Sequence, residues 1–182
     1  TLLGAAPNVQ ETDPEAYALF LQARYFHENG SSLENMEKAL ALYQSALVID
    51  DTYVPAWVWL AAGYLDYAPY GVIPADEALA LVESSIASAV ALDPNDPLVL
   101  GLNGSLTATI RGRFDEGTAM LQRALAQDPL NLMLLRWSAI TLGFMNRPES
   151  ATLINEYVLT RDPLGYISIT NLAIGYVDTG RY

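Results

Sequence analysis

The sequence predicts an all-α protein, a right-handed superhelical solenoid of antiparallel helix pairs, on the basis of three observations. First, four segments of the chain end alike, as LVIDDTY, ALDPND, AQDPLN and TRDPLG. Second, the residues after their shared aspartates are spaced 43, 35 and 34 positions apart, which is typical of helical-hairpin repeats. Third, small and apolar residues recur inside each unit at the spacing of packed helices. The residues that define the spacing are Asp51, Pro94, Pro129 and Pro163.

Nine helices are expected, separated by turn residues. A proline after the second helix of a pair cannot continue that helix, and it holds the preceding residue out of the helical region. Ser32 is placed to cap the second helix, and Pro148 lies in the first turn of the eighth. Glycine and asparagine mark the turns inside the pairs, such as Gly112-Arg113. We expect helices over 14–28, 33–49, 53–67, 75–91, 97–110, 114–126, 131–145, 148–160 and 164–178.

The chain divides into a linker, residues 1–12, and a solenoid, residues 13–182, of about four and a half units. The first interval between unit ends is longer than the others because of an insertion, Ala68 to Asp76, in the turn of the second pair. The insertion is either a disordered tip or a contact loop. The expected units are 14–52, 53–95, 96–130, 131–164 and a half unit, 165–182.

The interior of the units carries the packing pattern of a known repeat. In VPAWVWLAAGYLD, residues 54–66, the W-x2-L-G-x2-Y spacing is present with alanine in place of glycine. Two helices approach closely only where a side chain at their contact is small. The equivalent small residues are Ala23, Ala61, Gly104, Ala139 and Ala173. Residues 14–182 therefore resemble a tetratricopeptide repeat (TPR) domain, with departures such as Gly117 and Asn155.

A second resemblance concerns the context of the repeats. The opening DPEAYALFLQARYFHENGSSLENMEKALALYQSALVIDDTYVPAWVWLA is similar to repeat regions that follow effector domains in bacterial signalling proteins, namely class III adenylate or guanylate cyclases and winged-helix transcription regulators. This resemblance implies a non-catalytic regulatory module that binds a protein or peptide. The alternative is a free-standing TPR scaffold or assembly adaptor. The start at Thr1 shows no targeting segment, so we interpret the chain as a fragment of a longer, cytoplasmic protein.

Composition excludes several function classes. The 182 residues include 21 acidic and 9 basic side chains, one histidine and no cysteine, and the net charge is −12. The entire excess of acid lies in residues 1–110. Nucleic-acid binding is disfavoured because it needs clustered lysine and arginine. The longest apolar run, residues 53–65, is too short to span a membrane. No metal site, cofactor or thiol chemistry is predicted.

No catalytic set is evident either. His27 lies in the last turn of the first predicted helix, a position that the helix dipole favours, so a structural role is expected. Acidic pairs such as Asp115-Glu116 lie at helix boundaries and lack the spacing of a calcium loop. We therefore predict no enzymatic activity from this chain.

The concave face of such a solenoid is lined by the first helix of each unit. In the TPR family the lining positions are counted from the small packing residue, and here most of them are apolar or small. They favour an apolar or amphipathic partner segment, with Arg24 and Arg136 as isolated polar anchors. The alternative is that these side chains are buried between stacked units. The predicted groove residues are Phe20, Arg24, Val58, Ala62, Leu98, Ser105, Met133, Arg136, Ile140, Ile167, Thr170 and Ile174.

The last helix suggests a second contact. It stops where the turn of a repeat begins, and terminal repeats need a polar outer face. Its apolar residues include Leu172, Ala173 and Tyr176. We therefore predict self-association, as a possible homodimer, through residues 164–182.

Overall fold

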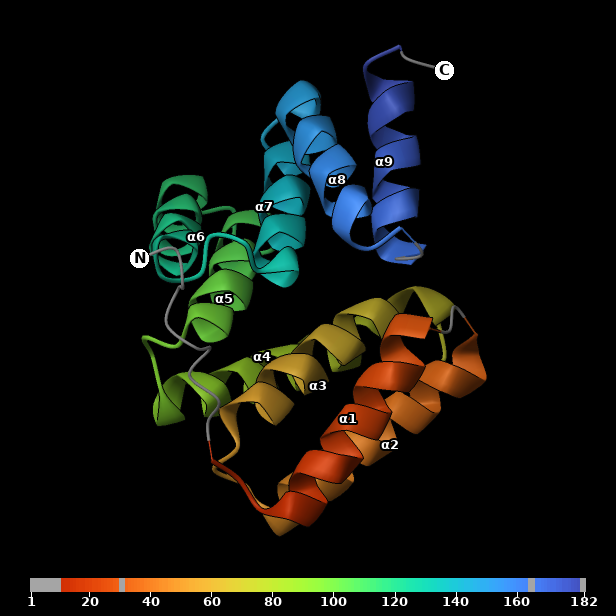
Figure 1. Ribbon diagram of the computed structural model, residues 1–182, viewed down its shortest axis with the longest axis vertical. Helices are drawn as coiled ribbons and strands as arrows, with labels where there is room; N and C mark the ends of the chain where they lie inside the picture. Colours follow the sequence, from red (N-terminus) through yellow and green to blue (C-terminus); the bar gives the residue numbers. More distant parts are fainter. Residues whose placement is uncertain (1–10, 30–31, 164–165, 181–182) are drawn as a thin grey trace.

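The computed structural model describes residues 11–29, 32–163 and 166–180 (Figure 1). Over these residues the chain forms nine α-helices and one short 3-10 helix and contains no strand, which confirms the predicted fold class. The bounds lie within two residues of the expected ones. The elements are α1 (Pro14–Asn29), α2 (Leu33–Ile49), α3 (Val54–Tyr67), η1 (Ala68–Tyr70), α4 (Ala75–Leu92), α5 (Pro97–Thr109), α6 (Phe114–Gln127), α7 (Leu132–Phe144), α8 (Pro148–Arg161) and α9 (Tyr166–Asp178).

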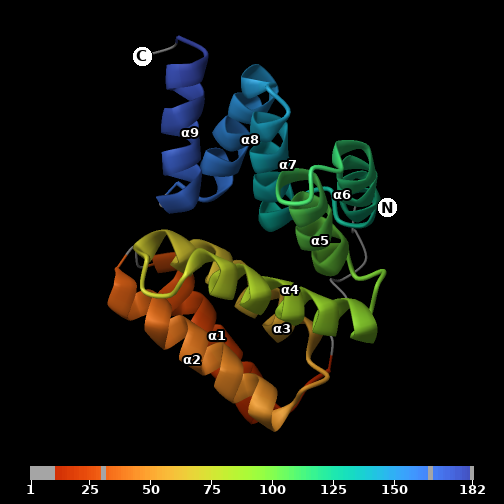
Figure 2. The same ribbon diagram turned by 180° about the vertical axis from the view of Figure 1, so that it is seen from behind.

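Consecutive helices form the expected pairs. Helix α1 packs on α2, α3 on α4, α5 on α6 and α7 on α8, and α9 packs on α8. The first helices of neighbouring units also touch, α1 with α3, α3 with α5, α5 with α7 and α7 with α9. Figures 1 and 2 show the pairs following one another along a curved path. The arrangement is a helical solenoid.

The shared aspartates have one structural role in all four units. Each is the residue that ends a second helix, with an extended or otherwise non-helical backbone. The Asp50 carboxylate accepts the Thr52 N–H at 3.0 Å, and the Asp93 carboxylate accepts the Asn95 N–H at 2.9 Å. Such turns direct the chain into the next unit. The four residues are Asp50, Asp93, Asp128 and Asp162.

Small residues allow the helices of a pair to approach. Ala23, Ala61 and Ala139 are buried, as their positions in the repeat require. In the α5–α6 pair Gly104 faces Gly117, so that a Cβ on either residue would collide with the other's carbonyl oxygen. Glycine at position 117, which departs from the TPR pattern, is therefore explained by the close approach of the two backbones.

The insertion is an ordered turn rather than an irregular tip. Residues 68–70 form the 3-10 helix η1, which follows α3 without a break. Gly71 ends it with φ of +68°, a left-handed conformation that glycine adopts without strain. The Tyr70 ring packs on that of Tyr67, with 6.3 Å between centroids. The start of the insertion is therefore regular structure, and its role as a contact loop stays a prediction.

None of the described helices has the length and apolar character needed to cross a membrane.

Candidate interaction surface

Five of the predicted groove residues are buried. Val58 has 0% of its surface exposed, and Ala62 lies beside it in the same helix. The Phe20 ring meets that of Tyr53 edge-on at 5.2 Å, so it joins α1 to the start of α3. These side chains are packed between helices and are not accessible to a partner in this conformation, contrary to the prediction. The buried residues are Phe20, Val58, Ala62, Ser105 and Arg136.

The third unit shows why the first helices stack so closely. Helix α7 covers α5, where a Cβ at Gly101 would collide with the side chains of Leu134 and Trp137. Ser105 lies one turn further along α5, and its hydroxyl accepts a hydrogen bond from the Thr141 hydroxyl of α7 at 3.2 Å. Glycine and serine at these positions therefore serve helix packing.

Neither predicted polar anchor is isolated. The Arg136 guanidinium donates to the Asp162 carboxylate and contacts the Met133 sulfur at 3.3 Å, which ties α7 to the end of α8. The Arg24 guanidinium lies 4.5 Å from the centroid of the Trp59 ring and pairs with the Glu28 carboxylate. Arg24 keeps a partly exposed side chain, whereas Arg136 is buried. Only Arg24 is thus available to a partner.

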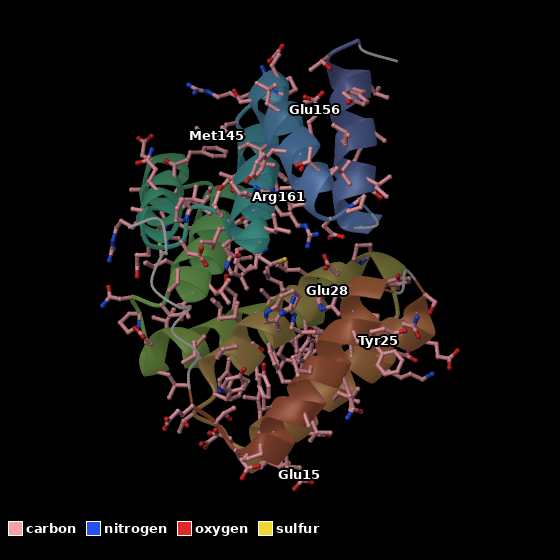
Figure 3. The ribbon with its side chains drawn as sticks, in the orientation of Figure 1. Glu15, Tyr25, Glu28, Met145, Glu156 and Arg161 are labelled. Atoms are coloured by element: carbon pink, nitrogen blue, oxygen red, sulfur yellow. The ribbon has the colours of Figure 1, made fainter. Side chains whose placement is uncertain are left out.

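The accessible members of the predicted set lie mostly on the later units. Leu98, Met133 and Ile140 are half-buried against the core, and Thr170 and Ile174 are exposed on α9. The side chain of Ile167 lies outside the described residues. In the view of Figure 3, Glu28 near the end of α1 and Arg161 at the end of α8 both lie close to the centre of the molecule. We define the first-helix face as Arg24, Leu98, Met133, Ile140, Thr170 and Ile174.

His27 joins three helices and has the expected structural role. Its Nε2 atom lies 3.0 Å from the Asp66 carboxylate of α3, and its Nδ1 atom lies 3.3 Å from the Tyr43 hydroxyl of α2. The ring meets Trp59 edge-on at 5.5 Å. Burial raises the pKa of Tyr43, so this hydroxyl stays protonated. The described residues hold no group of three metal-ligating side chains.

Two tryptophans, Trp59 and Trp137, also serve packing between units. Trp59 of α3 is buried against α1 through His27 and Arg24. Trp137 of α7 is buried against Gly101 of α5. Both tryptophans therefore contact a neighbouring repeat.

The exposed face of the last helix differs from the predicted one. The Tyr176 hydroxyl donates to the Glu156 carboxylate of α8 at 3.1 Å, and Leu172 is half-buried. Tyr176 therefore faces α8 instead of lying uncovered. Of the three predicted contact residues only Ala173 is exposed. The apolar stripe on α9 is Ile169, Ala173, Ile174 and Val177, and its three- and four-residue spacing was readable from the sequence.

The fold and this surface define the class of protein: the chain is a helical solenoid with the TPR fold. Among solved structures it is similar to TTC0263, a thermophilic TPR protein of Thermus thermophilus, with a TM-score of 0.63 and 18% identity. That similarity covers 90% of this chain and 82% of the other. The pilus biogenesis factor PilW matches with a TM-score of 0.58 and 18% identity over 93% of this chain and 72% of that one.

A curated relative is similar in sequence. The transcriptional regulator HilA of Salmonella typhimurium strain LT2 is 26% identical over 149 residues, which are 80% of this chain and 26% of HilA. The HilA of Salmonella typhi matches equally. The chain thus spans about a quarter of the length of these relatives. No protein-family model matches the chain.

Proposed function

We propose that this chain is a non-catalytic protein-binding module whose first-helix face takes an apolar or amphipathic segment of a partner. The observation that carries the proposal is the accessible surface of α5, α7 and α9, where Leu98, Met133, Ile140 and Ile174 present apolar atoms and the one arginine of α7, Arg136, is buried. Methionine and branched aliphatic side chains adapt to helical ligands, whose apolar residues recur every three or four positions.

Charge further limits the partner. The net charge of −12 disfavours an acidic peptide, and the single accessible arginine of the face, Arg24, is already paired with Glu28. An apolar segment is compatible with the acidic charge and with the pairing of Arg24, because its binding depends on the apolar surface area removed from water and not on charge.

We further propose that the module is the regulatory region of a bacterial transcription regulator. Two observations support this context: the opening segment resembles repeats that follow winged-helix effector domains, and a transcriptional regulator is the curated relative that matches. The match lies within a quarter of that relative, as expected of one region in a longer, cytoplasmic protein. The cyclase context rests on the resemblance of the opening segment alone. A free-standing scaffold or assembly adaptor is the alternative, and similarity to a pilus biogenesis factor favours it.

Site-specific photo-crosslinking tests the proposed face. A photoreactive amino acid replaces Met133 or Ile174 on the first-helix face, and the matched controls place it at Leu153 or Val48, which are exposed on the second helices α8 and α2. We expect the same partner to be crosslinked from both face positions and from neither control. Crosslinking of one partner at equal yield from all four positions would contradict the proposal. Val58 is unsuitable because its burial means that a charged substitution would unfold the chain.

A further inference from the structure

A second exposed apolar surface lies at one end of the first two helix pairs. The carboxyl ends of α1 and α3 and the amino ends of α2 and α4 meet at this end (Figures 1 and 2). Three apolar side chains there are exposed to solvent, Tyr25 by 64%, Tyr70 by 39% and Val72 by 48%. Tyr70 and Val72 belong to the insertion that no other unit has.

Two sets of contacts lie at this end, one between α1 and α2 and the other between α2, α3 and the insertion. The Tyr25 ring meets that of Phe26 edge-on at 5.7 Å, and the Lys38 ammonium of α2 lies 5.6 Å from the Phe26 centroid. Next to Lys38 in the sequence, Glu37 accepts a hydrogen bond from the Tyr67 hydroxyl at 3.4 Å. Tyr67 in turn packs on Tyr70. We call this surface the aromatic edge and define it as Tyr25, Phe26, Tyr67, Tyr70 and Val72.

The aromatic edge is surrounded by carboxylates. Six acidic residues lie among the last six residues of α1 and α3 or the first six residues of α2 and α4, against two basic residues, Arg24 and Lys38. Each base is already paired, Arg24 with Glu28 and Lys38 with Glu34. The potential at this end is therefore negative, which favours a basic ligand and opposes a second copy of this acidic chain. The acidic residues are Glu28, Glu34, Glu37, Asp66, Asp76 and Glu77.

We propose that the aromatic edge is a second interaction surface, which binds an arginine-bearing amphipathic segment of a partner protein. A guanidinium group stacks on an aromatic face and pairs with a carboxylate at the same time, and an exposed tyrosine beside acidic residues offers both partners. The chain contains this arrangement internally, because Arg24 lies over Trp59 and pairs with Glu28. The apolar side chains of the segment cover Val72 and the tyrosine rings. The insertion thereby adds a recognition surface at an edge that the regular repeat lacks.

Fluorescence anisotropy with a defined probe tests the proposal. The probe is a labelled peptide of about twelve residues that repeats Leu-Arg-Ala-Arg, and two further peptides carry lysine or glutamate in place of arginine. The variant is the double substitution Tyr25→Ser with Tyr70→Ser. The matched control is Val48→Ser, since Val48 is 87% exposed at the opposite end of α2. Both variants replace exposed side chains, and circular dichroism with urea unfolding checks that their stability equals that of the wild type.

The expected result is that the dissociation constant of the arginine peptide rises about tenfold in the double variant and stays unchanged in Val48→Ser. The lysine peptide binds the wild type more weakly than the arginine peptide, and the glutamate peptide does not bind. Equal binding to the wild type and the double variant would overturn the proposal, because general attraction to an acidic chain would then suffice. A wild-type dimer that the double variant abolishes would also overturn it, since the occupant would be a second copy.

This proposal and the proposed function fail separately. Charged substitutions on the first-helix face at Met133 or Ile174 leave the binding of the arginine peptide unchanged if the aromatic edge is its site. Loss of that binding in the first-helix variants, with retention in the tyrosine variant, would assign the peptide to the first-helix face and refute the aromatic edge.

Discussion

The close contact between α5 and α6 makes Gly117→Ala a sharp test of the packing argument. Alanine is a better helix former than glycine, so the substitution would ordinarily stabilise α6 by up to about 1 kcal/mol. Here the added Cβ would lie 2.7 Å from the Ala108 backbone nitrogen and 2.8 Å from the Ala108 Cβ, and it would also collide with the Gly104 carbonyl oxygen. No side-chain rotation relieves these contacts, because two of the three partners are backbone atoms.

The magnitude follows from the two opposed effects. Overpacking of a tight core contact costs about 3 kcal/mol at the upper end of its usual range. After the gain in helix propensity is subtracted, we expect Gly117→Ala to lower the free energy of unfolding by about 2 kcal/mol. Gly143→Ala is the matched control, since Gly143 is an exposed helical glycine of α7 with open space where its Cβ would be. That substitution should raise the free energy of unfolding by about 0.5 kcal/mol.

Urea unfolding followed by circular dichroism measures both changes. The midpoint should fall for Gly117→Ala and rise slightly for Gly143→Ala, with similar slopes for the two variants. If both substitutions stabilise the chain by the same amount, the backbones of α5 and α6 do not approach as described, and the explanation for glycine at position 117 is refuted.

Three further predictions concern buried polar groups and the last helix. A double-mutant cycle on His27→Ala and Asp66→Ala should give a coupling of about 0.5–1 kcal/mol in urea unfolding, and additive effects would show that the hydrogen bond contributes nothing. Burial raises the pKa of Tyr53 to about 12 from its ordinary value of 10, so the unfolded chain loses this proton first and stability should fall as the pH rises from 10 to 12. Urea midpoints across that range check the fall, which Tyr53→Phe should reduce. If residues 164–182 mediate self-association, light scattering of the wild type at high concentration should give a mass larger than that of the monomer. The variant Val177→Glu should give the mass of the monomer. A monomeric wild type would exclude self-association.

Much of the fold could be predicted from the sequence because the repeat is written in local signals. The aspartates that end each second helix and the small residues at the hairpin contacts fix the units without knowledge of their neighbours. Gly117 looked like a departure from the pattern, since its reason is the opposing Gly104 in another helix. A pattern within one unit does not contain such a contact.

The candidate surface was predicted less well for the same reason. Counting along a first helix identifies the side that faces the concave surface, but curvature decides which of those side chains the next unit covers. Val58 and Arg136 have the correct periodicity and are buried, the latter by a pairing with Asp162 that spans 26 residues. The aromatic edge was missed because Tyr25 and Tyr70 lie at the same end of the solenoid only once α1 and the insertion are packed into the fold.

The central claim is that a partner binds the first-helix face, and hydrogen exchange of the complex tests it most directly. The backbone amides of the chain are compared with and without the partner identified by crosslinking from Met133 or Ile174. The proposal predicts added protection in α7 and α9 and in the first turn of α5, with α4 and α6 unchanged. Added protection confined to α4 and α6, with α7 and α9 exchanging as in the free chain, would contradict it.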